Sequence, residues 1–116
     1  MQPLGVHHVS INVDDADEAI AFYTDVLGLT VRDDRPDFPF GGAWLDVGGQ
    51  QVHLLEIDVP DDKGQHFAIR VSDLDAAVAE LRSRDVTVTD PSPVGTSRQS
   101  FLHDPSGNRI ELHQPA

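Results

Sequence analysis

The chain contains no cysteine among its 116 residues. Disulfide bonds, thiolate metal ligands and a cysteine nucleophile are therefore excluded, and the redox compartment cannot be inferred from cysteine usage. Aromatic residues make up 6% of the sequence, with a single tryptophan, Trp44. No apolar run approaches the length of a membrane-spanning helix, and the first residues lack the basic and apolar segments of a secretory signal. We therefore expect a cytoplasmic protein with no membrane partner.

Basic residues are also scarce. The chain has 8 lysines and arginines against 20 aspartates and glutamates, which gives a formal net charge of −12 at pH 7. Such a charge repels nucleic-acid phosphates, so we expect no nucleic acid as a partner. The same field attracts cationic ligands and metal ions, although an acidic surface that maintains solubility is the simpler interpretation. At 116 residues the chain can bury the core of one compact domain and is too short for a second.

The segment Val6–Val13 predicts a first β-strand. Apolar and polar side chains alternate along it with a period of two, so the apolar row lies on one face and the polar row on the other. The apolar row is Val9, Ile11 and Val13, and the polar row is His8, Ser10 and Asn12. The same pattern returns half a chain length later in His66–Val71, with a histidine in the same place.

Each of these strands precedes a predicted helix with an aspartate cap. Acidic residues stand at the helix starts, in 14–18 and 72–75, and apolar residues then recur at spacings of three and four. The first helix is expected to end at Gly28. The remaining predicted strands comprise residues 29–32, 43–47, 51–57, 86–89, 99–103 and 109–113, with a linker at 59–64 and a loop at 90–97.

The two halves of the chain can be overlaid without gaps at one constant offset, the one that separates His8 from His66. The matched pairs include His8 with His66, Asp15 with Asp73, Asp46 with Asp104, and His53 with Glu111. We therefore predict a single domain made of two pseudo-repeats, residues 1–58 and 59–116. The expected fold class is α+β: two tandem βαβββ modules form a curved, mixed eight-stranded sheet, a half-barrel cup, with the helices on its convex face.

Four side chains that suit metal coordination fall on one face of the predicted cup. His53 and Glu111 each alternate with apolar neighbours and therefore point away from the helix-packing side. His8 and His66 lie on the same face by the same alternation. Three imidazoles and a carboxylate suit a divalent ion such as Zn, Ni, Co, Mn or Fe and leave coordination positions for substrate, but spacing alone does not name the metal. Any one histidine is better interpreted as a hydrogen-bonded structural residue, and only the symmetry of the two pairs favours a metal site.

Four segments carry a family pattern: His8–Ile11, Phe22–Leu29, His66–Val71 and Asp104–Leu112. Through them the sequence resembles, over essentially its whole length, the vicinal oxygen chelate superfamily of glyoxalases, fosfomycin-resistance enzymes, bleomycin-binding proteins and extradiol dioxygenases. The resemblance implies that His8, His66 and Glu111 are metal ligands. At the position of His53 the family often has Glu, Gln or His. The pattern is specific for the superfamily and not for one reaction within it.

The resemblance also implies a chemistry. A small-molecule substrate presents two neighbouring oxygens to a divalent metal ion, which stabilises an enolate or alkoxide in a lyase, isomerase or oxygenase reaction. Glu111 is the candidate catalytic base, because it is the only carboxylate among the ligands. Asn12 and Arg70 lie on the cup face of their strands and are either substrate contacts or partly exposed residues that point to solvent. Two half-cups can pair within one chain or across two, and an exposed sheet edge leads us to expect a homodimer.

A metal-free binding protein is the alternative function. Bleomycin-binding relatives use the same cup to sequester a cationic drug, and the acidic charge of this chain suits such a ligand. Phe38, Phe40, Trp44 and Phe101 are available as stacking surfaces, although packing in the core and loops is their simpler role. A sequestering protein has no need of histidines and a carboxylate together, so the metal-dependent enzyme is the favoured hypothesis. The scarcity of basic residues argues against the glutathione-using branch.

Overall fold

The computed structural model describes all residues, 1–116. The chain consists of two compact units, Met1–Pro60 and Asp61–Ala116, and each is a βαβββ module. The boundary between them lies inside the predicted linker at residues 59–64. The predicted α+β class and the two tandem modules are confirmed, and the eight strands are divided equally between two mixed four-stranded sheets, one in each unit. Neither helix has the length and apolar character that a membrane crossing requires.

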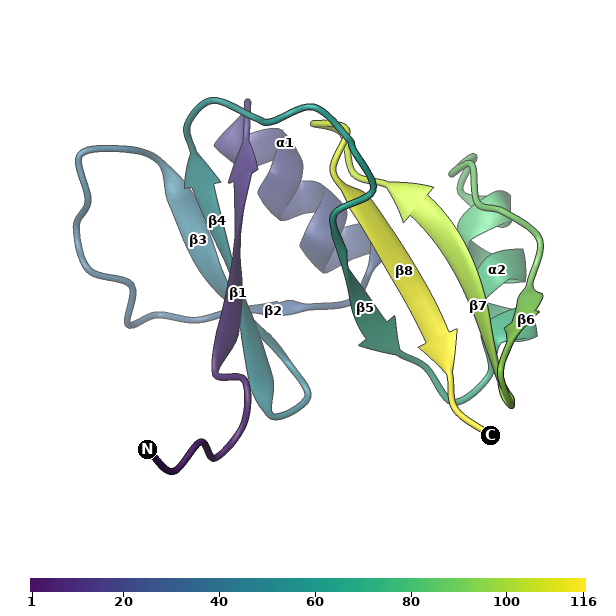
Figure 1. The fold of residues 1–116 in the computed structure, drawn as a ribbon. Helices are drawn as coiled ribbons and strands as arrows, with labels where there is room; N and C mark the ends of the chain where they lie inside the picture. The colour runs from purple at the N-terminus through teal and green to yellow at the C-terminus, as the bar shows by residue number, and fades with distance from the viewer. The chain divides into compact units, whose positions relative to one another are not determined.

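The first unit holds the sheet β1-β4-β3-β2 (Figure 1). Its elements are β1 (His8–Val13), α1 (Ala16–Ala21), the π-helical turn η1 (Phe22–Val26), β2 (Thr30–Val31), β3 (Gly42–Val47) and β4 (Gln50–Glu56). Strand β1 runs parallel to β4, and the other neighbours are antiparallel. Helix α1 contacts β3 and β4. The predicted helix is thus shorter than expected: it changes to π geometry at Phe22, before the chain turns at Gly28 with a φ of 78°.

The second unit repeats this plan with the sheet β5-β8-β7-β6 (Figure 1). Its elements are β5 (His66–Arg70), α2 (Leu74–Ser83), β6 (Ser92–Val94), β7 (Ser97–His103) and β8 (Arg109–Gln114). Strand β5 runs parallel to β8, and α2 contacts β7 and β8. One prediction here was wrong. Residues 86–89 form no strand beyond an isolated bridge at Val88, and the outer strand is β6, inside the predicted loop at 90–97. All three residues of β6 are exposed, so the strand has no apolar alternation, and its Pro93 is tolerated at a sheet edge.

Both helices begin in the same way, and the predicted aspartate caps are confirmed. The carboxylate of Asp15 accepts a hydrogen bond from the backbone N–H of Glu18, and the carboxylate of Asp73 accepts one from Ala76. The last residues of β4 and β8 each supply a second hydrogen-bond acceptor to the start of the helix in the same unit. Glu56 Oε2 lies 2.7 Å from the backbone nitrogen of Ala16, and Gln114 Oε1 lies 2.7 Å from that of Leu74.

The constant offset between the halves holds for the parallel strand pairs and fails in the hairpins. His53 and Glu111 are matched by the constant offset. The residues opposite them, Trp44 in the first unit and Phe101 in the second, are separated by one residue less than that offset. The second hairpin therefore contains one extra residue. The match of Asp46 with Asp104 is wrong for this reason, because Asp46 lies in β3 while the carboxylate of Asp104 accepts backbone hydrogen bonds within the turn after β7.

The apolar face of each sheet packs under the helix of the same unit. The residues that are completely or almost completely buried include Val13, Tyr23, Leu45, Val52 and Leu54 in the first unit, and Leu74, Leu102 and Ile110 in the second. The alternating residues of the same strands form the opposite face, which carries the histidines, Glu111 and Arg70. Each unit thus presents a mostly polar sheet face away from its helix.

Candidate functional site

The first unit brings together two of the predicted ligands, His8 on β1 and His53 on β4. Their rings are stacked with centroids 3.9 Å apart and planes 13° from parallel. His53 is 6% exposed, and its Nε2 atom donates a hydrogen bond of 2.8 Å to Oε1 of Gln51. Burial, together with the neighbouring His8 and His7, lowers the pKa of His53. A neutral imidazole is the form that binds metal ions.

The second unit brings together the other two predicted ligands, His66 on β5 and Glu111 on β8. His66 Nε2 lies 3.1 Å from Glu111 Oε1, and Glu111 is 8% exposed. His66 Nδ1 lies 2.7 Å from the carbonyl oxygen of Gly64. Because a carbonyl only accepts, Nδ1 carries a proton, and in the neutral form of the ring the Nε2 lone pair faces Glu111. A lone pair and a carboxylate that face each other repel, and a cation bound between them would relieve this repulsion.

Imidazole nitrogens and a carboxylate oxygen are donor types that bind divalent metal ions in proteins. Metal-binding histidines usually donate their second ring N–H to a carbonyl or carboxylate, as His66 does. Carboxylate ligands are usually held by further hydrogen bonds, and Nδ1 of His113 donates one of 2.7 Å to Oε2 of Glu111. No group of three or more His, Asp or Glu side chains is arranged around a common point as in a metal centre. The structure thus pairs the four predicted ligands two by two, one pair in each unit.

The two pairs occupy equivalent positions in their sheets. His53 lies opposite Ser10, two residues after His8 on β1. Glu111 lies opposite Ala68, two residues after His66 on β5. Each pair therefore spans a parallel strand pair on the same diagonal, as the constant offset between the two halves predicted for these strands.

The two predicted substrate contacts differ in their surroundings. Asn12 Nδ2 donates a hydrogen bond of 2.8 Å to the backbone carbonyl of Asp58, so its amide holds the segment that follows β4. Arg70 is exposed at the end of β5 and has no acidic partner. It borders a cavity of about 450 Å³ together with Val71, Ser72, Gln114, Pro115 and Ala116. Five other arginines form ion pairs within their own unit: Arg32, Arg82, Arg84, Arg98 and Arg109.

An aromatic row extends from the long loop of the first unit to the histidine pair. Trp44 stacks on His53 with ring centroids 4.3 Å apart. The ring centroid of Phe38 lies 6.4 Å from that of Trp44 and 5.3 Å from that of Phe40, whose ring is nearly parallel to it. Phe38 is 41% exposed, so packing does not account for its whole surface. The sequence indicated these residues as available stacking surfaces, but it did not predict that Trp44 stacks on His53 or that Phe38 stacks on Phe40.

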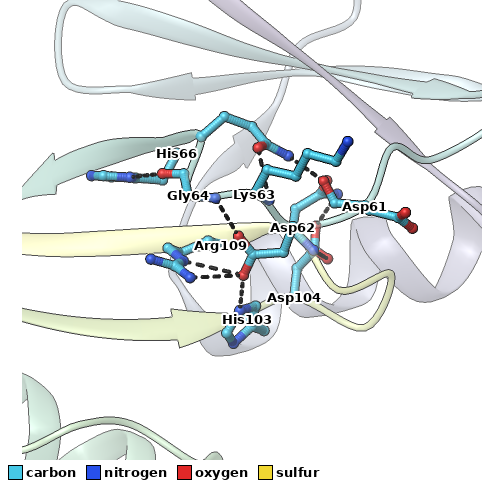
Figure 2. A network of polar contacts seen from close by, with 10 residues as sticks. Asp61, Asp62, Lys63, Gly64, His66, His103, Asp104 and Arg109 are labelled. Atoms are coloured by element: carbon cyan, nitrogen blue, oxygen red, sulfur yellow. Dashed lines mark hydrogen bonds and ion pairs between the residues drawn. The ribbon is translucent and has the colours of Figure 1, made fainter.

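A polar network around Asp62, shown in Figure 2, was not predicted from the sequence. Asp62 Oδ2 accepts hydrogen bonds from Nε2 of His103 at 2.8 Å and Nε of Arg109 at 3.1 Å. Its Oδ1 accepts one from the backbone N–H of Gly64 at 2.9 Å. These donors, with His103 the largest contributor, lower the pKa of Asp62 to about 2. The composition of residues 59–64 is typical of a linker, and no periodic pattern there signals a contact with β7 and β8.

Comparison with known proteins identifies the family. The model of the glyoxalase/bleomycin resistance protein/dioxygenase superfamily matches residues 5–112. A probable lactoylglutathione lyase of Vibrio cholerae is 33% identical over 92% of this chain and 88% of its own length. Two solved structures cover all of this chain: a glyoxalase family protein from Bacillus anthracis, with 27% identity, 98% coverage of its own chain and a TM-score of 0.86, and the antibiotic-binding protein TnmS3 from a Streptomyces species, with 29% identity, 99% coverage and a TM-score of 0.83. The chain therefore belongs to the glyoxalase/bleomycin resistance protein/dioxygenase superfamily, and its fold is the vicinal oxygen chelate fold.

Proposed function

We propose that this chain is a divalent-metal-dependent enzyme of the vicinal oxygen chelate type. His8, His66 and Glu111 are the proposed ligands, with His53 as the fourth. The observation that carries the proposal is the His66–Glu111 pair, in which Nε2 and Oε1 face each other at 3.1 Å while Gly64 fixes the ring proton on Nδ1. The equivalent diagonal position of His8 and His53 supports a shared function of the two pairs.

The proposed reaction is a lyase, isomerase or oxygenase step on a small molecule with two adjacent oxygens. When bound, Zn, Ni, Co, Mn or Fe supplies Lewis-acid stabilisation of negative charge on substrate oxygens. Glu111 is the proposed base: its buried carboxylate would take a proton from the substrate carbon next to the two oxygens, leaving the electron pair of the broken C–H bond in an enolate, and would then return the proton to the product, while His113 holds the carboxylate in place. Arg70 is the proposed contact for an anionic group of the substrate, because no acidic residue competes for it. Asn12 is retained as a second proposed contact, on the polar face of β1.

We further propose that the two pseudo-repeats, residues 1–58 and 59–116, act as a single glyoxalase-like domain. Strands β1 and β5 each lie at the edge of their sheet, and each carries one of the proposed histidine ligands. Exposed sheet edges favour association, so the proposed assembly is a homodimer, with the cup formed within one chain or across two.

Lactoylglutathione is the first substrate to test. It appears in the name of the Vibrio cholerae relative, and its lactoyl group offers a hydroxyl and a carbonyl oxygen on neighbouring carbons. Its glutathione part is anionic at neutral pH, whereas this chain carries a net charge of −12. A smaller or less anionic substrate with the same pair of oxygens is therefore the second candidate.

Metal analysis of protein purified without added metal or chelator tests the proposal. We expect a bound divalent ion that is lost in the His66→Ala and Glu111→Gln variants, and turnover that disappears with chelator and returns with metal. Glu80→Gln, an exposed substitution on α2 in the same unit, is the matched control and should retain the ion. A folded wild-type protein that takes up no divalent ion on titration would rule the proposal out.

The aromatic row favours a second candidate function, metal-free sequestration of a drug or antibiotic as in bleomycin-resistance proteins. The exposed Phe38 and the stacked Trp44 provide flat aromatic surfaces within the acidic first unit. The structural similarity to TnmS3, an antibiotic-binding protein, supports this second candidate. Because Trp44 is the single tryptophan, its fluorescence reports binding directly. Quenching by a planar cationic antibiotic that is unaffected by chelator, in a chain without metal, would favour this function over the enzyme.

A further inference from the structure

Hydrogen bonds from the second sheet to the carboxylate of Asp62 hold the loop that leads into β5. Asp62 accepts hydrogen bonds from His103, the last residue of β7, and from Arg109, the first residue of β8. Its other oxygen accepts the backbone N–H of Gly64. Figure 2 shows these contacts converging on Asp62, with Gly64 between it and His66. The Asp62 side chain is 22% exposed, so these bonds are partly shielded from water.

We propose that Asp62 is a positioning residue that sets the ring orientation and proton position of His66 through the carbonyl of Gly64. This inference rests on the proposed function only for its consequence, metal affinity, and not for its structural content. Asp62 does not contact the proposed metal site. It acts through the loop backbone, in which Gly64 joins the anchored carboxylate to the histidine ring.

The geometry of Gly64 connects the two ends of this arrangement. Its N–H bonds to Asp62 and its carbonyl oxygen lies 2.7 Å from His66 Nδ1. The residue has a φ of 104°, a backbone conformation that side-chain-bearing residues rarely adopt, and a Cβ there would meet no atom within 4 Å. Glycine is therefore favoured at position 64 by its backbone conformation and not by lack of space for a side chain. This conformation directs the Gly64 carbonyl at His66.

Neighbouring residues of the loop supply a matched control. Gln65 bridges the loop internally, with its side chain bonded to the backbone of Asp61 and Lys63. Asp61 is adjacent to Asp62 and carries the same charge, but its side chain makes no hydrogen bond or ion pair with β7, β8 or Gly64. A change that acts only through net charge affects both aspartates alike, whereas the proposed positioning belongs to Asp62 alone.

The test uses the tautomer of His66 in the metal-free protein, read from the ring ¹³C and ¹⁵N chemical shifts at about pH 9, where ordinary histidines are neutral. We expect the Nδ1–H form in the wild type and in Asp61→Asn. In Asp62→Ala we expect a mixture with a majority of the Nε2–H form. Gly64→Ala should shift the tautomer in the same direction without altering Asp62, which keeps the proposal testable if Asp62→Ala fails to fold.

Metal titration provides the second measurement. With Co²⁺ as the probe, we expect Asp62→Ala to bind about 10- to 100-fold more weakly than wild type, the usual effect of losing an outer-shell partner, and Asp61→Asn to bind like wild type. An unchanged tautomer in a folded Asp62→Ala variant would overturn the inference. If the wild type binds no Co²⁺ while the tautomer responds as expected, the proposed function fails and the positioning role of Asp62 stands.

Discussion

Nδ1 of His113 donates a hydrogen bond of 2.7 Å to Oε2 of Glu111, two residues earlier on the same face of β8. The other carboxylate oxygen of Glu111 faces His66. One oxygen is therefore held by a neighbouring imidazole while the other is directed at the proposed ligand partner. This division of the two oxygens is the arrangement expected of a carboxylate that binds metal through one atom and is oriented through the second.

Removal of the His113 ring should weaken metal binding without abolishing it. We expect His113→Ala to lower the affinity for Co²⁺ by about 10- to 100-fold, because Glu111 loses the bond that orients it. Isothermal titration with the wild type and variant measures this ratio. Gln99→Ala is the control, since Gln99 lies opposite His113 on β7 without a hydrogen bond to Glu111. Equal affinities in His113→Ala and wild type would show that His113 has no part in the site.

Arg70 should affect substrate binding and not metal binding. The side chain has no acidic partner and lies on the polar face of β5. We expect Arg70→Ala to raise KM for an anionic substrate about tenfold, the loss of one exposed charged contact, while metal content stays that of wild type. Steady-state kinetics with lactoylglutathione, or with the substrate that screening identifies, gives this value. Arg98→Ala, which removes an arginine paired with Asp75, should leave KM unchanged.

The Asp62 network should make stability depend on acid. The pKa of Asp62 is lowered from 3.8 to about 2 in the folded chain, so its carboxylate binds protons less readily there than in the unfolded chain. Its stabilising contribution is therefore complete above about pH 5 and is lost as the pH falls toward 2. Thermal unfolding of Asp62→Asn and wild type should differ at pH 6 and converge near pH 2. Asp61→Asn should show no such convergence, and a difference for Asp62→Asn that persists at pH 2 would contradict this explanation.

Gly42 marks a close approach of β3 to β4. Its φ is 152°, and a Cβ at this position would collide with the carbonyl oxygen of Leu54. We expect Gly42→Ala to lower the free energy of unfolding by about 1 to 3 kcal/mol, because backbone atoms on β4 must move. Gly49→Ala in the adjacent turn meets no atom within 4 Å and should change stability by less than about 0.5 kcal/mol. Urea denaturation measures the free energy of unfolding of both variants. If Gly42→Ala is as stable as Gly49→Ala, the close approach of β3 to β4 does not require glycine at position 42.

Periodicity predicted most of this fold because it depends on local patterns. The alternation in β1, β4, β5 and β8 identified the buried and polar faces, and the aspartate caps located both helix starts. Strand β6 was missed because an exposed edge strand needs no apolar row. The hairpin match of Asp46 with Asp104 failed because a turn can accept one extra residue without disturbing the parallel strands on either side.

The candidate site was predicted in part for a related reason. His8, His53, His66 and Glu111 lie in regular strands, where alternation determines the face, so the face that each of them occupies could be predicted. Their joint role as ligands of one metal ion stays a prediction. Asp62, Gly64 and His113 act through loop geometry or hydrogen bonds between specific atoms. Such contacts leave no periodic trace in a sequence, so only the three-dimensional structure reveals them.

The proposed function requires His8 and His66 to bind the same metal ion, and metal stoichiometry tests this requirement most directly. Co²⁺ titration of the wild type, His8→Ala and His66→Ala, followed by visible absorption, gives the number of ions per chain in each. We predict one ion per chain in the wild type and loss of that same ion in either variant, because His8 and His66 are both proposed ligands of it. An ion that persists at wild-type affinity in the folded His8→Ala or His66→Ala variant would contradict the claim.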